Sequence, residues 1–185
     1  EGAVLMSDGY EVYNGIAHSH GLIHLGCWAH ARRYFVEAEA VLPKAARRPD
    51  QLATQFIAAI ARLYAVEVKA KVKAVAERAQ LREAASRPVL AEIQHMLVTH
   101  RHSVTPGSLL GKALHYLSAQ WPKLIRYADN GLWPIDNNLC ENAIRPFVVG
   151  RRYPRSTIRQ ASFAFVAEAW SQSGLRLNLL FPNFA

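Results

Sequence analysis

The central part of the chain, residues 50–130, carries apolar side chains at helical spacing, and this pattern constrains the fold more than any other feature. Spacing of three to five positions predicts one long helix that begins after an N-cap at Asp50. Its apolar positions are Leu52, Phe56, Ile60, Leu63, Val68, Val72, Val75 and Ala79. Similar patterns predict further helices that begin at residues 86–88 and 106–108, and a short one from Pro122 to about Ala128. The block is therefore predicted to be entirely helical.

The segment before this block has a different pattern. Short apolar runs at residues 3–6 and 22–28 predict two strands, and helical spacing returns at residues 29–42. Residues 43–49, with two prolines and several basic side chains, are typical of a linker. We therefore predict an α/β fold that is mostly helical overall, because a large helical insertion interrupts a strand-containing domain.

The predicted domain boundaries follow from these patterns. We expect a core segment at residues 1–49, a helical insertion at 50–130, a second core segment at 131–152 and an atypical tail at 153–185. Because the first residue is a glutamate and an apolar run follows almost at once, the chain is expected to be a piece of a longer protein.

The charge balance indicates the class of partner. Lys and Arg number 22 against 14 acids, a net charge of +8, which favours a polyanion such as DNA, RNA, the ribosome or an acidic lipid surface. No apolar run approaches the roughly 20 residues that span a bilayer, and no signal peptide opens the chain. With only two cysteines, a cytoplasmic protein without a disulfide framework is predicted.

Most acidic residues have an ordinary structural explanation. Asp50 and Asp129 suit a cap and a turn. The predicted surface charges on helices are Glu37, Glu39, Glu67, Glu77, Glu83 and Glu92. Asp8, at the predicted end of a strand, and Asp136 with Glu141 remain. Such carboxylates from distant segments are what a pair of Mg²⁺ ions requires, although Asp8-Gly9 could equally form a simple tight turn.

Residues 135–146 are the densest polar stretch. A short helix that begins near Asn137, capped by Asp136 or Asn137, would bury Leu139 together with Ala143 and Phe147. Glu141 and Arg145 would share its other face. A surface helix with one ordinary ion pair explains the same pattern.

A zinc site is the alternative chemistry. His18, His20, His24, Cys27 and His30 lie within thirteen positions, and Cys27 and His30 form a C-x-x-H. No second pair lies at zinc-finger spacing, so Cys27 is better explained as a small core residue and the histidines as polar loop and surface groups. Neither a nucleophile elbow nor a glycine-rich phosphate loop is present.

Several blocks in order resemble one family, the bacterial insertion sequence 66 transposases, a group within the DDE transposases. The blocks are Ser7-Asp8-Gly9-Tyr10 with Tyr13, Cys27-Trp28-Ala29-His30-Ala31-Arg32-Arg33 with Phe35, Leu63-Tyr64 with Glu67, Ala113 with Tyr116, Trp121 and Leu124, and Asp136-Asn137-Asn138 with Glu141-Asn142 and Ala143-Ile144-Arg145-Pro146, followed by Gly150-Arg151-Arg152. Together they cover about residues 3–152.

The resemblance implies a partial RNase H-like core that cuts and joins DNA strands with two Mg²⁺ ions. It assigns Asp8 as the second catalytic and metal-binding acid and Glu141 as the third, with the first acid outside this chain. Asp136, Asn137 and Asn138 would support the site. The residues expected to contact DNA phosphates are Arg32, Arg33, Arg145, Arg151 and Arg152.

An incomplete set of acids leads us to expect no activity from this chain alone. A homo-oligomer would be expected of the intact enzyme. Two alternatives remain: a non-catalytic DNA-binding or oligomerisation fragment, and a degenerate remnant of a mobile element. The tail after residue 152 departs from the family pattern, and we hypothesise that a frameshift or a fused element replaced the native ending.

Overall fold

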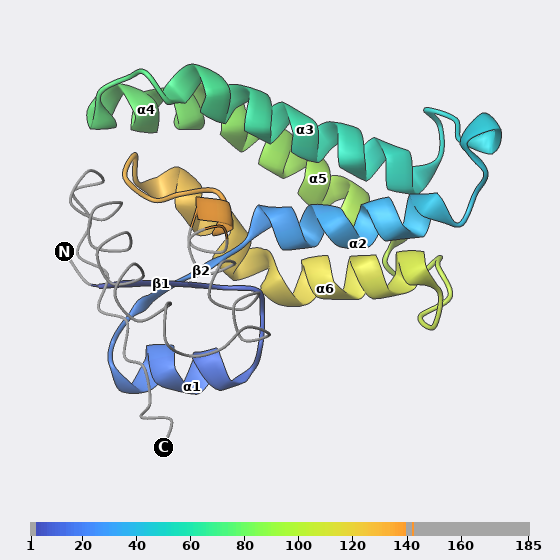
Figure 1. The fold of residues 1–185 in the computed structure, drawn as a ribbon, viewed down its shortest axis with the longest axis horizontal. Coiled ribbons are helices and arrows are strands. Elements are labelled where there is room, and N and C mark those ends of the chain that lie inside the picture. Colours follow the sequence, from blue (N-terminus) through green and yellow to red (C-terminus); the bar gives the residue numbers. More distant parts are fainter. Residues whose placement is uncertain (1–2, 140–141, 143–185) are drawn as a thin grey trace, which may run out of the picture. The chain divides into compact units, whose positions relative to one another are not determined.

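A computed structural model describes residues 3–139 and residue 142. This part of the chain is mostly helical and contains a small two-stranded parallel sheet, which confirms the predicted α/β class in its coarse form (Figure 1). The described residues divide into two compact units. The first comprises residues 3–5, 11–24, 137–139 and 142, and the second comprises residues 6–10 and 25–136.

The sheet consists of β1 (Val4–Ser7) and β2 (Ile23–Gly26), with α1 (Val12–Ser19) between them in the chain. Gly21, at φ +61°, adopts the left-handed conformation that lets the chain leave α1, and Leu22 N donates to Ala17 O at 2.8 Å. Ile23 N then donates to Ala3 O at 2.9 Å, which brings β2 alongside β1.

Residues 137–139 and 142 of the first unit belong to the region in which the sequence predicted a short helix that begins near Asn137. Asn138, Leu139 and Asn142 are helical, in agreement with a helix that begins near Asn137. Leu139 is 70% exposed, so its predicted burial is wrong. Ala143 and Phe147, the other members of that apolar stripe, lie outside the described residues.

Helices make up the second unit. In chain order they are α2 (Trp28–Ala40), the 3₁₀ turn η1 (Lys44–Ala46), α3 (Leu52–Ala70), α4 (Val75–Leu81), the π-helical turn η2 (Arg82–Ser86), α5 (Arg87–His100), α6 (Leu109–Leu124) and the 3₁₀ helix η3 (Ile125–Asp129). α2 lies against both α3 and α6, and α3 packs on α5 (Figure 1). The predicted domain boundaries remain a prediction.

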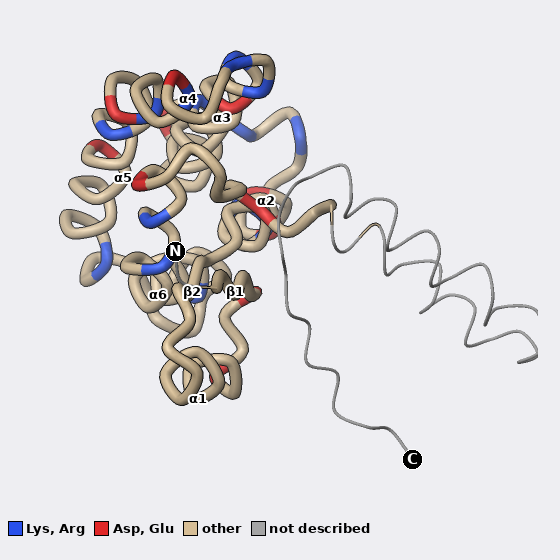
Figure 2. Tube along the Cα trace, turned by 90° about the vertical axis from the view of Figure 1, so that its left-hand side faces the viewer, with Lys and Arg blue, Asp and Glu red and all other residues tan. Residues whose placement is uncertain are grey.

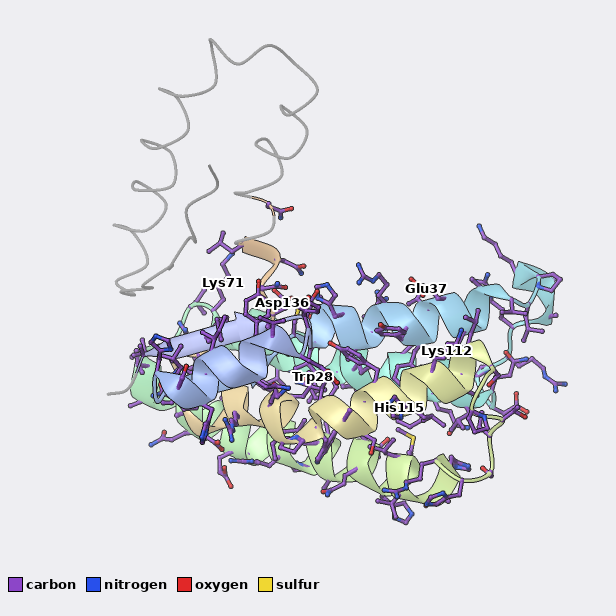
Figure 3. The ribbon with its side chains drawn as sticks, turned by 90° about the horizontal axis from the view of Figure 1, so that it is seen from below. Trp28, Glu37, Lys71, Lys112, His115 and Asp136 are labelled. Carbon is purple, nitrogen blue, oxygen red and sulfur yellow. The ribbon has the colours of Figure 1, made fainter. Side chains whose placement is uncertain are left out.

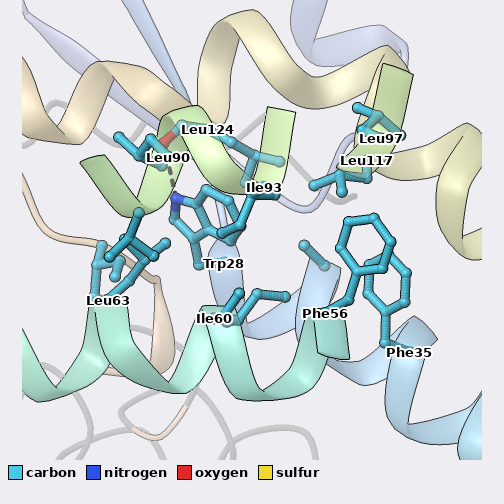
Figure 4. Close-up of a cluster of buried hydrophobic side chains, with 14 of the residues drawn as sticks. Trp28, Phe35, Phe56, Ile60, Leu63, Leu90, Ile93, Leu97, Leu117 and Leu124 are labelled. Carbon is cyan, nitrogen blue, oxygen red and sulfur yellow. Dashed lines mark hydrogen bonds between the residues drawn. The ribbon is translucent and has the colours of Figure 1, made fainter. Parts of the chain in front are cut away.

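One apolar core joins these helices, with Trp28 of α2 at its centre (Figure 4). The indole nitrogen of Trp28 donates to Leu124 O at 2.9 Å, so this large side chain is buried without leaving its polar group unsatisfied. Phe35 and Phe56 stack with ring centroids 4.5 Å apart and fix α2 against α3. Trp28 therefore anchors the first turn of α2.

The predicted helix ends are correct in some places and wrong in others. A helix was predicted to begin at residues 106–108, and α6 does begin there, with Ser108 as a cap that accepts from Gly111 N at 2.9 Å. Asp50 is not a cap, because α3 begins after Gln51. The short helix expected from Pro122 is instead the end of α6, which contains Pro122, followed by the 3₁₀ helix η3. The helix expected to begin at residues 86–88 continues directly from α4 through η2.

The single long helix predicted from Asp50 to Ala79 is wrong, because α3 ends at Ala70 and α4 begins at Val75. The reason is tertiary. Arg82 forms a bidentate ion pair with Glu67, with Nε to Oε1 at 2.8 Å and Nη2 to Oε2 at 2.6 Å. Residues fifteen positions apart in one straight helix would lie about 22 Å apart along its axis. The chain must therefore reverse between them.

This ion pair also corrects the assignment of Glu67 as a solvated surface charge. The side chain of Arg82 is 2% exposed and that of Glu67 is 17% exposed. Arg82 Nη1 donates in addition to Tyr127 O at 2.8 Å and Asn130 O at 2.6 Å, and its guanidinium lies over the Tyr127 ring at 5.1 Å. One buried arginine thus connects α3, η2 and the end of η3.

Candidate active site at the strand end

Asp8 follows the last residue of β1, where the sequence placed it, and its side chain is exposed. Gly9 adopts φ +99°, a conformation that favours glycine, so the chain turns sharply just after Asp8. Asp8 Oδ1 accepts from Tyr10 N at 3.2 Å, and Ser7 Oγ accepts from Gly9 N at 3.3 Å. The turn predicted as the ordinary explanation of Asp-Gly is therefore present, and it presents an exposed carboxylate at the strand end.

Tyr116 of α6 forms a hydrogen bond to the backbone of this turn. Its hydroxyl donates to the backbone carbonyl of Asp8 at 2.6 Å, and its ring stacks on Tyr34 of α2 with centroids 4.6 Å apart. Burial, followed by the negative charges of neighbours that include Asp8, raises the pKa of Tyr116, while Arg33 opposes the shift. The phenol therefore stays protonated and keeps donating to the Asp8 carbonyl.

Asp136 is held in a similar way. Tyr64 of α3 donates its hydroxyl to Asp136 Oδ2 at 2.8 Å, and the Asp136 side chain is half-buried. The preceding residue, Ile135, accepts from Trp28 N at 3.2 Å, which places this loop at the N-terminus of α2 (Figure 3). Helix N-termini favour negative charge, and so the position suits a carboxylate.

The pKa of Tyr64 reports the same neighbourhood. Burial raises it first, and the hydrogen bond and charge of Asp136 raise it further, while Arg32 lowers it. Cys27 contributes to the raised pKa of both Tyr64 and Tyr116. α2 contacts the support of both acids, because Trp28 N donates to Ile135 O at 3.2 Å and Tyr34 stacks on Tyr116.

The two described DNA-contact candidates, Arg32 and Arg33, are both exposed on α2. Arg33 Nε lies 4.0 Å from Glu37 Oε1 in an i,i+4 pair that is exposed on both sides. Such a pair contributes little to stability. Basic and acidic positions lie close together over the helices, as Figure 2 shows. Both arginines are accessible to a phosphate, and an ordinary solvated helix face would explain their exposure equally well.

The remaining predicted site residues separate into two groups. Asn137 and Asn138 belong to the first compact unit and are half-buried and exposed, respectively. Glu141, Arg145, Arg151 and Arg152 lie outside the described residues. The catalytic assignments of Asp8 and Glu141 therefore stay predictions.

Metal-binding side chains do not gather in the described part of the chain. Within residues 3–139 and 142, no three His, Cys, Asp or Glu side chains are placed to hold one metal ion. Cys27 is fully buried, as a core residue should be. His18 and His20 are exposed as predicted, but His24 is buried, because β2 carries it into the interior. Glu141, the other predicted Mg²⁺ ligand, lies outside the described residues.

A family comparison identifies the chain. The model of the family described as "Transposase IS66 family" matches residues 1–162. The chain belongs to the IS66 transposase family. The matched range extends ten residues beyond Arg152, the last residue of the sequence motifs, and so includes the first part of the segment predicted as an atypical tail.

Relatives of this IS66 chain occur in Sinorhizobium fredii (strain NBRC 101917 / NGR234). The uncharacterized protein y4qI is 31% identical over 156 residues, which cover 80% of this chain and 28% of the relative. The uncharacterized protein y4jD is 27% identical over 155 residues, which cover 80% of this chain and 29% of the relative. The IS66 chain thus spans less than a third of the length of these relatives, and no solved structure gives a significant match.

The structural roles of Tyr64, Tyr116 and Arg82 in the IS66 chain were not predicted from the sequence. Tyr64 and Tyr116 stood in the family-like blocks without a role, yet each fixes the backbone or side chain of a candidate acid. Arg82 stood in no motif. An arginine in a stretch with alanines, six residues before Pro88, was the available signal, but its partner Glu67 could be found only once the reversal of the chain was known. Among the described residues, no helix is long and apolar enough to cross a membrane.

Proposed function

We propose that this chain supplies part of the catalytic core of a transposase that cuts and joins DNA strands, with Asp8 as one of its catalytic carboxylates. The observation that carries the proposal is the exposed Asp8 carboxylate at the end of β1, within a chain of the IS66 transposase family. Ligands of open α/β sheets gather at strand ends of this kind. On this proposal β1 and β2 belong to an RNase H-like core.

The described side chains have defined tasks in this scheme. Tyr116 fixes the Asp8 backbone, and the turn at Gly9 keeps the carboxylate directed outward. Arg32 and Arg33 would attract the DNA backbone to the start of α2. Asp136, held by Tyr64, would fix the loop that leads toward Glu141. These residues position the DNA and the acids rather than react themselves.

Mg²⁺ is the proposed cofactor. Two bound ions would activate the attacking oxygen and stabilise the leaving oxygen of the phosphodiester. Asp8 and Glu141 are the residues proposed to hold them, together with at least one further carboxylate. The described residues alone form no group of three metal-binding side chains, so the proposed Mg²⁺ site depends on Glu141, which lies outside them.

Calorimetric titration with Mg²⁺ in the presence of duplex DNA tests the proposal. We expect Asp8→Asn to weaken Mg²⁺ binding at least tenfold, because one anionic ligand is lost. Asp50→Asn is the matched control, since Asp50 is also exposed and pairs with Arg48 in the segment before α3. Equal Mg²⁺ affinity in the wild type, Asp8→Asn and Asp50→Asn would refute the role of Asp8.

A further inference from the structure

The turn between α3 and α4 concentrates positive charge at an exposed part of the second unit. Lys69, Lys71 and Lys73 lie within five residues, and every residue from Lys71 to Glu77 is exposed. Val72, between two of the lysines, is 89% exposed. We call residues 69–75 the α3–α4 turn; Lys71 marks it in Figure 3.

The lysines of the α3–α4 turn differ from the paired cations of the same unit. In the described part of the chain, Arg33, Arg47, Arg48, Arg62 and Arg87 each lie within 4.0 Å of a carboxylate. No described acid lies within that distance of Lys69, Lys71 or Lys73. The acids nearest in sequence are already engaged, since Glu67 pairs with Arg82 and Glu77 accepts from Ala74 N at 3.3 Å.

The α3–α4 turn is held in shape from inside the unit. Arg78 donates to Ala70 O at 3.3 Å, to Lys73 O at 3.4 Å and to Gly131 O at 3.0 Å. One side chain therefore connects the end of α3, the turn itself and the loop after η3. A binding surface that is already ordered loses less conformational entropy when it meets its partner.

We propose that the α3–α4 turn contacts the phosphate backbone of duplex DNA, at a surface separate from the Asp8 turn. The inference rests on the proposed transposase function, for which DNA is the expected polyanionic partner. Exposed lysines bind phosphates as point charges and release condensed counterions, so their contribution depends steeply on salt and little on base sequence.

An acidic membrane surface is the competing partner, because lysines mixed with exposed valines also suit the lipid interface. Interfacial binding relies on a wide apolar helix face, whereas the α3–α4 turn is short and non-helical at residues 71–74. The chemistry therefore favours DNA, and vesicles serve as an arm of the test.

Fluorescence anisotropy with a duplex of random sequence, at several salt concentrations, tests the inference on the full 185-residue chain. We compare Lys71→Gln/Lys73→Gln with the control Lys44→Gln/Lys112→Gln, which removes the same charge from exposed lysines elsewhere. Two lost phosphate contacts should make the slope of log K against log salt shallower by about 1.8. Between roughly 50 and 200 mM salt, the wild type should therefore lose about twelvefold more of its affinity than the Lys71→Gln/Lys73→Gln variant loses. Lys71→Arg/Lys73→Arg should keep the wild-type slope.

Three outcomes would overturn the inference. Equal changes of slope in the two Gln variants would refute the α3–α4 turn while leaving DNA binding intact. Absence of DNA binding by the wild type would refute the proposed function and this inference together. Wild-type binding to phosphatidylserine vesicles that Lys71→Gln/Lys73→Gln abolishes, without an effect on DNA affinity, would assign the turn to a membrane surface. Cooperative melting of both Gln variants at the wild-type temperature shows that the substitutions leave the fold intact.

Discussion

The buried pair between Arg82 and Glu67 offers the sharpest test of how the helices are held together. In Glu67→Gln the guanidinium keeps its bonds to two backbone carbonyls but loses its counter-charge inside the protein. Breaking one partner of a buried pair typically costs 3–5 kcal/mol, and since Glu67 retains some exposure we expect about 3 kcal/mol. For a protein of this size that cost lowers the melting temperature by roughly 6–12 °C.

Arg82→Met should cost at least as much, because it removes the cation and also leaves the carbonyls of Tyr127 and Asn130 without their donor. The double variant Glu67→Gln/Arg82→Met no longer contains an isolated charge. Its cost should therefore be smaller than the sum of the two single costs by more than about 1 kcal/mol. Urea unfolding followed by circular dichroism measures all three variants.

The matched control is the exposed pair of Arg62 and Glu92, which joins α3 to α5. Arg62→Met and Glu92→Gln should each cost less than about 1 kcal/mol, because solvent screens an exposed pair. The reasoning is refuted if Glu67→Gln costs no more than Glu92→Gln, or if the double-variant cycle shows no coupling.

Three further outcomes are expected. Burial raises the pKa of Tyr127 to about 12, whereas a tyrosine in the unfolded chain titrates near 10. The folded state therefore keeps this proton to higher pH, and the free energy of unfolding should fall as pH rises from about 10 to 12. Urea unfolding at several pH values should show a smaller fall in the unfolding free energy for Tyr127→Phe than for the wild type. Gly131→Ala would place its Cβ 2.1 Å from Val75 O and should destabilise by about 1–3 kcal/mol in the same assay, unlike Gly15→Ala, where space is open. In a strand-transfer assay with Mg²⁺ the chain alone should be inactive, and activity that Glu141→Gln abolishes would contradict this expectation.

Helical spacing predicted the helices where local signals and packing agree. The pattern located α5 and α6, and the Pro106-Gly107-Ser108 segment located the start of α6, because helix-start signals are encoded within a few residues. The break between α3 and α4 carries no glycine or proline. It depends on Arg82 meeting Glu67 and on Gly131 approaching Val75, contacts between distant segments that periodicity does not contain.

The candidate site was predictable to a similar depth. The end of an apolar run placed Asp8 correctly at the end of β1, and Asp136 proved to be a well-supported carboxylate beside α2. The hydroxyl of Tyr116 on the Asp8 backbone and that of Tyr64 on Asp136 could not be predicted, because each joins residues more than seventy positions apart. Glu141 lies outside the described residues, so its meeting with Asp8 is still a prediction.

That meeting is the central claim, and iron-mediated backbone cleavage tests it most directly. Fe²⁺ with ascorbate and peroxide, in the presence of duplex DNA, cuts the chain beside the bound ion. The proposal predicts cuts near both Asp8 and Glu141, and excess Mg²⁺ should suppress them. Asp8→Asn alone should remove both cuts, and so should Glu141→Gln alone. Cuts near only one of the two residues, or cuts that both variants leave unchanged, would contradict a shared metal site.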